Sequence, residues 1–76
     1  MEGSMGMTAE QWIAEFCGQI GEEPPDQAQF EAILRLASVA AHGSERMAAP
    51  VACWVAGTTG RPVKELIEMA EALERA

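Results

Sequence analysis

Positive charge is scarce in this chain of 76 residues. Five lysines and arginines stand against twelve aspartates and glutamates, and the formal net charge is −7. No nucleic acid is expected as a partner, because phosphate attraction supplies most of that affinity and needs a basic surface. An anionic membrane surface would repel the chain as well, and no apolar run approaches the roughly 20 residues that span a membrane. With no recognisable secretion signal, a cytoplasmic location is expected.

Metal-binding and redox motifs are missing as well. The two cysteines, Cys17 and Cys53, show no CxxC spacing and have no histidine close to them in the sequence. In a chain without a secretion signal both are interpreted as buried thiols, and a disulfide between them is the alternative. Neither a metal site nor a cofactor is expected.

A catalytic constellation is also lacking. His42 is the only histidine, and hence the only neutral-pH general base that the chain offers. Ser38 and Ser44 lie near it, but their spacing sets up no nucleophile, base and orienting group. His42 is better explained as a residue of a last helical turn, followed by Gly43 as a left-handed terminating residue. We therefore expect a protein that is not an enzyme.

The composition favours short helices joined by tight turns. Apolar residues make up 49% of the chain, which fits one small folded domain, and seven glycines and four prolines supply turns. Residues 1–6, MEGSMG, have the character of an expression remnant and are expected to be disordered. A single helical domain is expected over residues 7–76.

Two helix starts are marked by capping boxes. Thr8 is followed three residues later by Gln11, and Asp26 by Gln29, so each pair can satisfy free amides of a first turn. Gly21 offers a left-handed residue that ends the first helix. Two further helices are expected, one after Pro50 and one after Pro62, with apolar residues at helical spacing.

Residues 40–60, AAHGSERMAAPVACWVAGTTG, form the segment around which the fold is expected to be organised. No charge lies between Arg46 and Arg61, and a helix that is apolar all round belongs in an interior. The other predicted helices each have one apolar stripe and one charged face. Short turns make successive helices antiparallel neighbours. The expected fold is all-α, a small four-helix up-down bundle with a central apolar third helix.

The tryptophan of this third helix has two interpretations. Trp54 can pack in the core, or it can be an exposed anchor on a partner-binding face, since tryptophan is favoured at interfaces. A core this small leaves both open. The residues expected to bind a protein partner are Trp12, Arg46, Met47 and Trp54.

A second candidate site is the segment TTGRPVK, residues 58–64. Free amides at the start of the fourth helix could face an anion beside Arg61 and Lys64, with His42 as a further weak candidate. The segment lacks the P-loop spacing, so a helix-ending glycine followed by a helix-starting proline explains it more simply.

A family resemblance enters at the same segment. The chain resembles a small actinobacterial domain of unknown function, with the pattern HG-x-x-R-x-A-A-P followed by an apolar helix ending in glycine. The matching residues are His42, Gly43, Arg46, Ala48, Ala49, Pro50 and Gly57. That family is found alone or C-terminal to molybdenum-cofactor guanylyltransferase-like proteins. The resemblance implies an accessory role near molybdopterin guanine dinucleotide assembly and carries over no catalytic residues.

The leading hypothesis is a non-enzymatic helical accessory domain that binds a protein partner, with a molybdenum-cofactor biosynthetic protein as one candidate. The alternative is a module that binds a small anionic ligand such as a nucleotide or a pterin. A homodimer is compatible with either, because the second and third helices could pack across a twofold axis.

Overall fold

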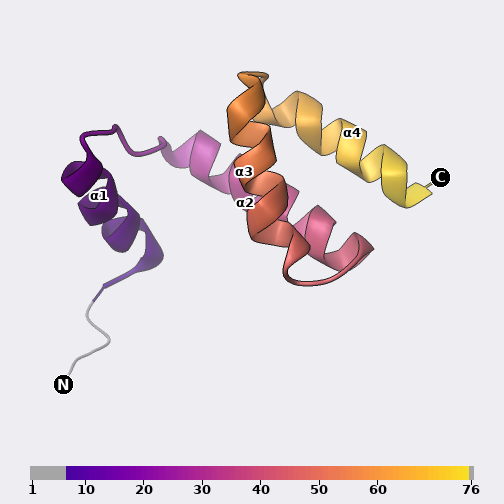
Figure 1. Cartoon of the computed structure of the whole chain (residues 1–76), viewed down its shortest axis with the longest axis horizontal. Helices are drawn as coiled ribbons and strands as arrows, with labels where there is room; N and C mark the ends of the chain where they lie inside the picture. Colours follow the sequence, from indigo (N-terminus) through magenta and orange to yellow (C-terminus); the bar gives the residue numbers. More distant parts are fainter. Residues whose placement is uncertain (1–6, 76) are drawn as a thin grey trace.

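Four helices and no strand make up the part of the chain that the computed structural model describes, residues 7–75. The helices are α1 (Ala9–Ile20), α2 (Gln27–Gly43), α3 (Ala48–Thr59) and α4 (Val63–Arg75) (Figure 1). The expected all-α class is thus confirmed, in a form consistent with a small helical bundle. The expectation for residues 1–6 lies outside the described residues. Among the described helices, none is both long and apolar enough to cross a membrane.

Both predicted capping boxes are present. The Thr8 hydroxyl accepts the Gln11 amide at 3.1 Å, and the Gln11 side chain accepts the Thr8 amide at 2.9 Å. Asp26 and Gln29 make the same reciprocal pair at 2.8 and 3.0 Å. These bonds satisfy amides that a helix start leaves without partners. Gly21 ends α1 with φ 78°, the left-handed conformation expected of it.

The end of α2 differs from the expectation. Gly43 is the last residue of the helix and does not take a left-handed conformation. The Ser44 hydroxyl donates to the Ala40 carbonyl at 2.8 Å instead. A side chain therefore satisfies a terminal carbonyl, so the helix end does not need a left-handed glycine to do so.

The helix with neighbours on two sides is α2. It packs against both α3 and α4 (Figure 1), whereas α3 was expected to be central. Leu36 of α2, 4% exposed, is the one buried residue among those whose burial is described. The apolar character of α3 comes largely from alanines, which can line a seam without being enclosed on all sides.

An ion pair also joins α2 to α4. Arg35 of α2 donates to the carboxylate of Glu71 of α4. The guanidinium side chain is mostly exposed, so the pair contributes at most about 1 kcal/mol. The α2–α4 seam therefore depends mainly on apolar contact around Leu36.

Helix α1 is set apart from the other three. It joins them through segment 21–26 and lies to one side in Figure 1. The radius of gyration is 14.1 Å and the longest dimension is 46 Å, whereas a compact chain of this length has a radius of about 11 Å. Much of α1 consequently remains exposed.

We predict that Leu36→Ala lowers the free energy of unfolding by about 2–5 kcal/mol, because a buried leucine is replaced by a cavity. Leu34→Ala is the matched control, since Leu34 lies on the same helix but is 55% exposed, and a loss below about 1 kcal/mol is expected there. Urea unfolding followed by circular dichroism measures both. Equal losses would contradict the placement of the core at Leu36.

Candidate functional site: an exposed apolar face on α3

Helix α3 turns its small residues inward and its large apolar residues outward. The half-buried positions share a small side chain: Ala48, Ala49, Ala52, Cys53 and Ala56. The exposed large apolar positions are Val51, Trp54 and Val55 of the helix and Met47 at its N-cap, and we call these four residues the α3 face. A helix of a self-contained domain normally does the reverse.

Helical spacing explains how both faces arise from one segment. The large residues recur at positions i, i+4, i+7 and i+8 from Met47, so they share one side of the helix. Pro50 lies in the first turn, and Gly60 ends the helix with φ 73°. The seam with α2 is narrow enough for the Cys53 thiol to donate to the Ile33 carbonyl at 3.8 Å. The alanines allow this approach and leave the larger side chains on the outside.

The exposure on the α3 face is high. Met47 and Trp54 are each 72% exposed, and Val51 is 61% exposed. Trp54 is therefore outside the core in this chain, which answers the question that the sequence left open. Neighbouring exposed apolar side chains of this size are characteristic of a binding surface.

A second exposed stripe runs along α1. Trp12, Phe16 and Ile20 recur every four residues, and each is about half exposed. The rings of Trp12 and Phe16 stack on each other, with centroids 5.2 Å apart and planes 19° apart. This contact lies within α1 and covers neither ring fully. We call these three residues the α1 stripe.

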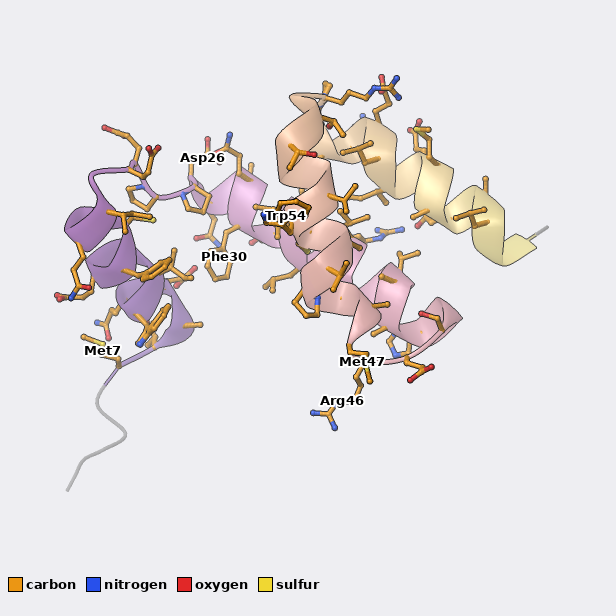
Figure 2. All side chains as sticks on the ribbon, in the orientation of Figure 1. Met7, Asp26, Phe30, Arg46, Met47 and Trp54 are labelled. Atoms are coloured by element: carbon orange, nitrogen blue, oxygen red, sulfur yellow. The ribbon has the colours of Figure 1, made fainter. Side chains whose placement is uncertain are left out.

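Three of the four predicted partner-binding residues belong to one region. Arg46 and Met47 lie in the turn that leads into α3, and Trp54 lies further along the same helix (Figure 2). The fourth, Trp12, belongs to α1 and so to the separate stripe. Figure 2 shows Trp54 and Phe30 on the side of the molecule that faces α1.

The residues proposed for an anion site do not converge. Arg61 lines a hollow of about 230 Å³ whose other walls include Leu36, Cys53 and Gly57. Its guanidinium lies 3.4 Å from the Glu65 carboxylate, so a cation there is already partly neutralised. Lys64 lines a different hollow, between α2 and α4, which is also lined by Glu31, Arg35, Glu68 and Glu71.

The third candidate for that site, His42, is engaged locally. Its Nδ1 lies 2.9 Å from the Ser38 carbonyl oxygen and 3.1 Å from the Ser38 hydroxyl, one turn back on α2. A proton on Nδ1 can be donated to that carbonyl, which fixes the ring against its own helix. The geometry fits the expected role in a last helical turn.

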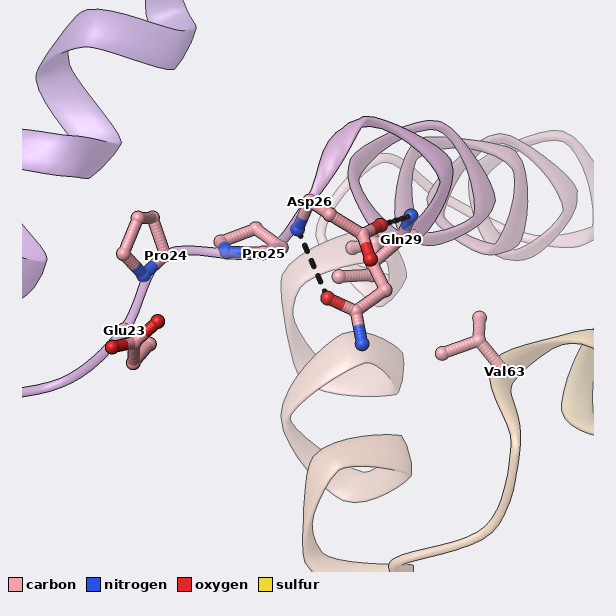
Figure 3. A pocket seen from close by; sticks show the side chains of 7 residues that line it. Glu23, Pro24, Pro25, Asp26, Gln29 and Val63 are labelled. Atoms are coloured by element: carbon pink, nitrogen blue, oxygen red, sulfur yellow. Dashed lines mark hydrogen bonds between the residues drawn. The ribbon is translucent and has the colours of Figure 1, made fainter.

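A further hollow, of about 580 Å³, lies at the start of α2, beside Glu23, Pro24, Pro25 and Val63 (Figure 3). Asp26 and Gln29 also line it, but the dashed bonds in Figure 3 show both side chains used in the capping box. Among the residues that the structure describes, no group of three or more acidic, histidine or cysteine side chains could hold a metal ion.

The two cysteines are free thiols, each half buried, and the structure contains no disulfide between them. Burial raises the pKa of the Cys53 thiol above its ordinary value, because desolvation disfavours the thiolate. A raised pKa is the opposite of what activates a nucleophilic cysteine. Cys53 is thus a packing residue of the α2–α3 seam.

Four residues that the structure exposes on these surfaces were not among the predicted site residues: Phe16, Ile20, Val51 and Val55. A usable signal was present on α3. Alanines at four-residue spacing mark the side of a helix that a neighbour approaches closely, so the opposite side must hold the large residues. On α1 no comparable signal exists, because an apolar stripe looks the same whether or not it is covered.

Comparison with known families gives one match. The model of the domain of unknown function DUF6457 matches residues 5–76, which confirms the resemblance to a domain family of unknown function. No curated protein matches the chain. No solved structure matches it either.

We predict that the rate at which iodoacetamide alkylates Cys53 increases with pH in the Cys17→Ser variant. In the folded chain this increase should occur at higher pH than in the same chain unfolded in urea. The folded state holds the thiol proton more tightly, so this group's contribution to stability is complete below the ordinary thiol pKa of 9.0 and is lost as pH rises through the raised value. Mass spectrometry of quenched samples measures the rate. Identical pH profiles would contradict the burial of this thiol.

Proposed function

The chain belongs to the DUF6457 family, and we propose that it is a non-enzymatic helical accessory domain whose α3 face binds a protein. The observation that carries the proposal is the orientation of α3. Its alanines pack on α2, while Met47, Val51 and Trp54 are 61–72% exposed. A protein surface that removes these side chains from water would gain about 25 cal/mol for each Å² of apolar area.

The chemistry of the face suits a protein partner. Trp54 is a rigid, large, amphipathic side chain, and tryptophan and arginine are the residue types that dominate interface energies. Met47 adds a flexible side chain that adapts to the opposing surface. Arg46, at the edge of the face, makes no ion pair within the described part of the chain. It is therefore placed to meet an acidic group at the rim.

The proposed biological context is the one that the family resemblance implies. An actinobacterial, cytoplasmic domain that occurs beside molybdenum-cofactor guanylyltransferase-like proteins would act in molybdopterin guanine dinucleotide biosynthesis. In that context the domain would recruit or assemble proteins and leave nucleotide transfer to the catalytic protein.

A binder of small anionic ligands is the second candidate, favoured by the hollow beside Arg61. That hollow has a glycine-containing wall formed partly by Gly57 and Gly60. At about 230 Å³ it is smaller than the roughly 300 Å³ at which ligand pockets begin. Glu65 beside the guanidinium also opposes an anion. Both facts favour the protein-binding function.

We predict that a photoreactive benzoylphenylalanine in place of Trp54 crosslinks to protein when the chain is expressed and irradiated in an actinobacterial host. The matched control carries the same amino acid in place of Glu68, an exposed residue of the charged side of α4, and should give far less product. Mass spectrometry identifies the captured chain. Absence of any protein product at position 54 would refute the proposed function.

We also predict that GTP, a pterin and inorganic phosphate, each at millimolar concentration, leave the melting temperature of the purified chain unchanged. A ligand that binds the folded chain raises its free energy of unfolding. Once the ligand concentration exceeds the dissociation constant, this increase grows with the logarithm of the concentration. Differential scanning fluorimetry over a tenfold concentration series measures the effect. A shift that grows with concentration and disappears in Arg61→Ala would favour the ligand-binding alternative.

A further inference from the structure

We infer that the partner of the α3 face is a second copy of this chain, with α1 of each protomer packed on α3 of the other. This inference rests on the proposed function, since it names the occupant of the same face. It also gives a role to the α1 stripe, which otherwise stays half exposed.

The two surfaces match in length and periodicity. Helices α1 and α3 both have 12 residues, which corresponds to about 18 Å each. The α1 stripe recurs at i, i+4 and i+8, and Met47, Val51 and Val55 of the α3 face have the same spacing. Ridges formed by residues four apart interdigitate in the commonest class of helix packing. Trp54 then lies beside the seam and can close over it.

The connecting segment explains why α1 does not cover its own chain's α3. Gly21 ends α1 in a left-handed conformation, and Pro24 and Pro25 follow shortly before α2 begins at Gln27. Consecutive prolines form stiff, extended spacers and do not make a tight reversal. α1 is held to one side of the α2–α4 unit (Figure 1). A helix held away from its own chain in this way is suited to domain swapping, in which it packs on an identical protomer.

Charge is complementary across the proposed contact. Every charged side chain in residues 7–26 is acidic: Glu10, Glu15, Glu22, Glu23 and Asp26. Helix α3 has no charged residue, and arginines flank it, Arg46 before and Arg61 after. Arg61 already pairs with Glu65, so Arg46 is the flanking cation that makes no ion pair within residues 7–75. Because acidic groups lie near both ends of α1, one of them can approach Arg46 with either orientation of the two helices. The pairing offsets part of the repulsion between two chains that each carry a net charge of −7.

The exposed area is sufficient for such a dimer. The chain exposes 5833 Å², whereas a compact monomer of its mass exposes about 4,500 Å². A specific stable interface buries about 1,200–2,000 Å² in total, or about 600–1,000 Å² from each copy. Two symmetric α1–α3 contacts would provide it.

The first measurement is the solution mass of the full chain by light scattering, over a range of concentrations. We expect twice the chain mass. Phe16→Glu in the α1 stripe and Val51→Lys in the α3 face should each weaken the dimer at least about 30-fold, the scale of a central interface residue. Gly18→Glu is the matched control: it adds the same charge to the opposite side of α1, where a side chain meets open space. It should leave the mass unchanged.

Mixing the two weakened variants tests which surfaces meet. In a mixed dimer, the intact α1 of the Val51→Lys chain packs on the intact α3 of the Phe16→Glu chain. The other contact brings a glutamate-bearing α1 to a lysine-bearing α3. The mixture should therefore dimerise more tightly than either variant alone. Circular dichroism of each variant establishes that its helices still form.

The remaining outcomes overturn the inference in distinguishable ways. A monomer in which both tryptophans show blue-shifted, unquenched fluorescence would mean that α1 folds onto its own α3, and the proposed function would fail with it. A monomer with water-exposed tryptophans would leave the face free for a different protein, so that only the inference fails. A dimer that is unaffected by Phe16→Glu and Val51→Lys would place the self-interface elsewhere.

Discussion

The packing of α3 and α4 on α2 is the interaction on which the arrangement of the other parts of this molecule depends. Leu36 alone is buried there among the residues whose burial is described, and α3 and α4 contribute mainly alanines and half-buried aliphatic residues around it. A core this small cannot also cover α1 or the large side chains of α3. The exposed surfaces are therefore a direct result of how little one chain encloses.

Local signals in the sequence were enough to predict the helices. The capping pairs Thr8–Gln11 and Asp26–Gln29 and the left-handed Gly21 depend on residues three or four apart, so the chain specifies them without tertiary context. Tertiary placement was harder to predict. The uniform apolarity of α3 indicated a central helix, but alanine counts as apolar whether it fills a core or lines a narrow seam, and α2 holds the centre instead.

The candidate site was predictable in part for the same reason. Arg46, Met47 and Trp54 could be chosen because they interrupt an alanine-rich segment with residue types typical of interfaces. Val51 and Val55 could not be separated from core residues by type alone. The separation of α1 depends on the stiffness of segment 21–26, which leaves no periodic pattern in α1 itself.

The two prolines between α1 and α2 have a consequence for the concentration scale on which this domain operates. A flexible connector would present α1 to its own α3 at a millimolar effective concentration, whereas a stiff one that cannot span the sites reduces this value towards zero. In the proposed dimer, the first helix would then find an α3 face only on another chain in solution. The cellular concentration of the protein would then set the fraction of chains whose α1 stripe and α3 face are covered.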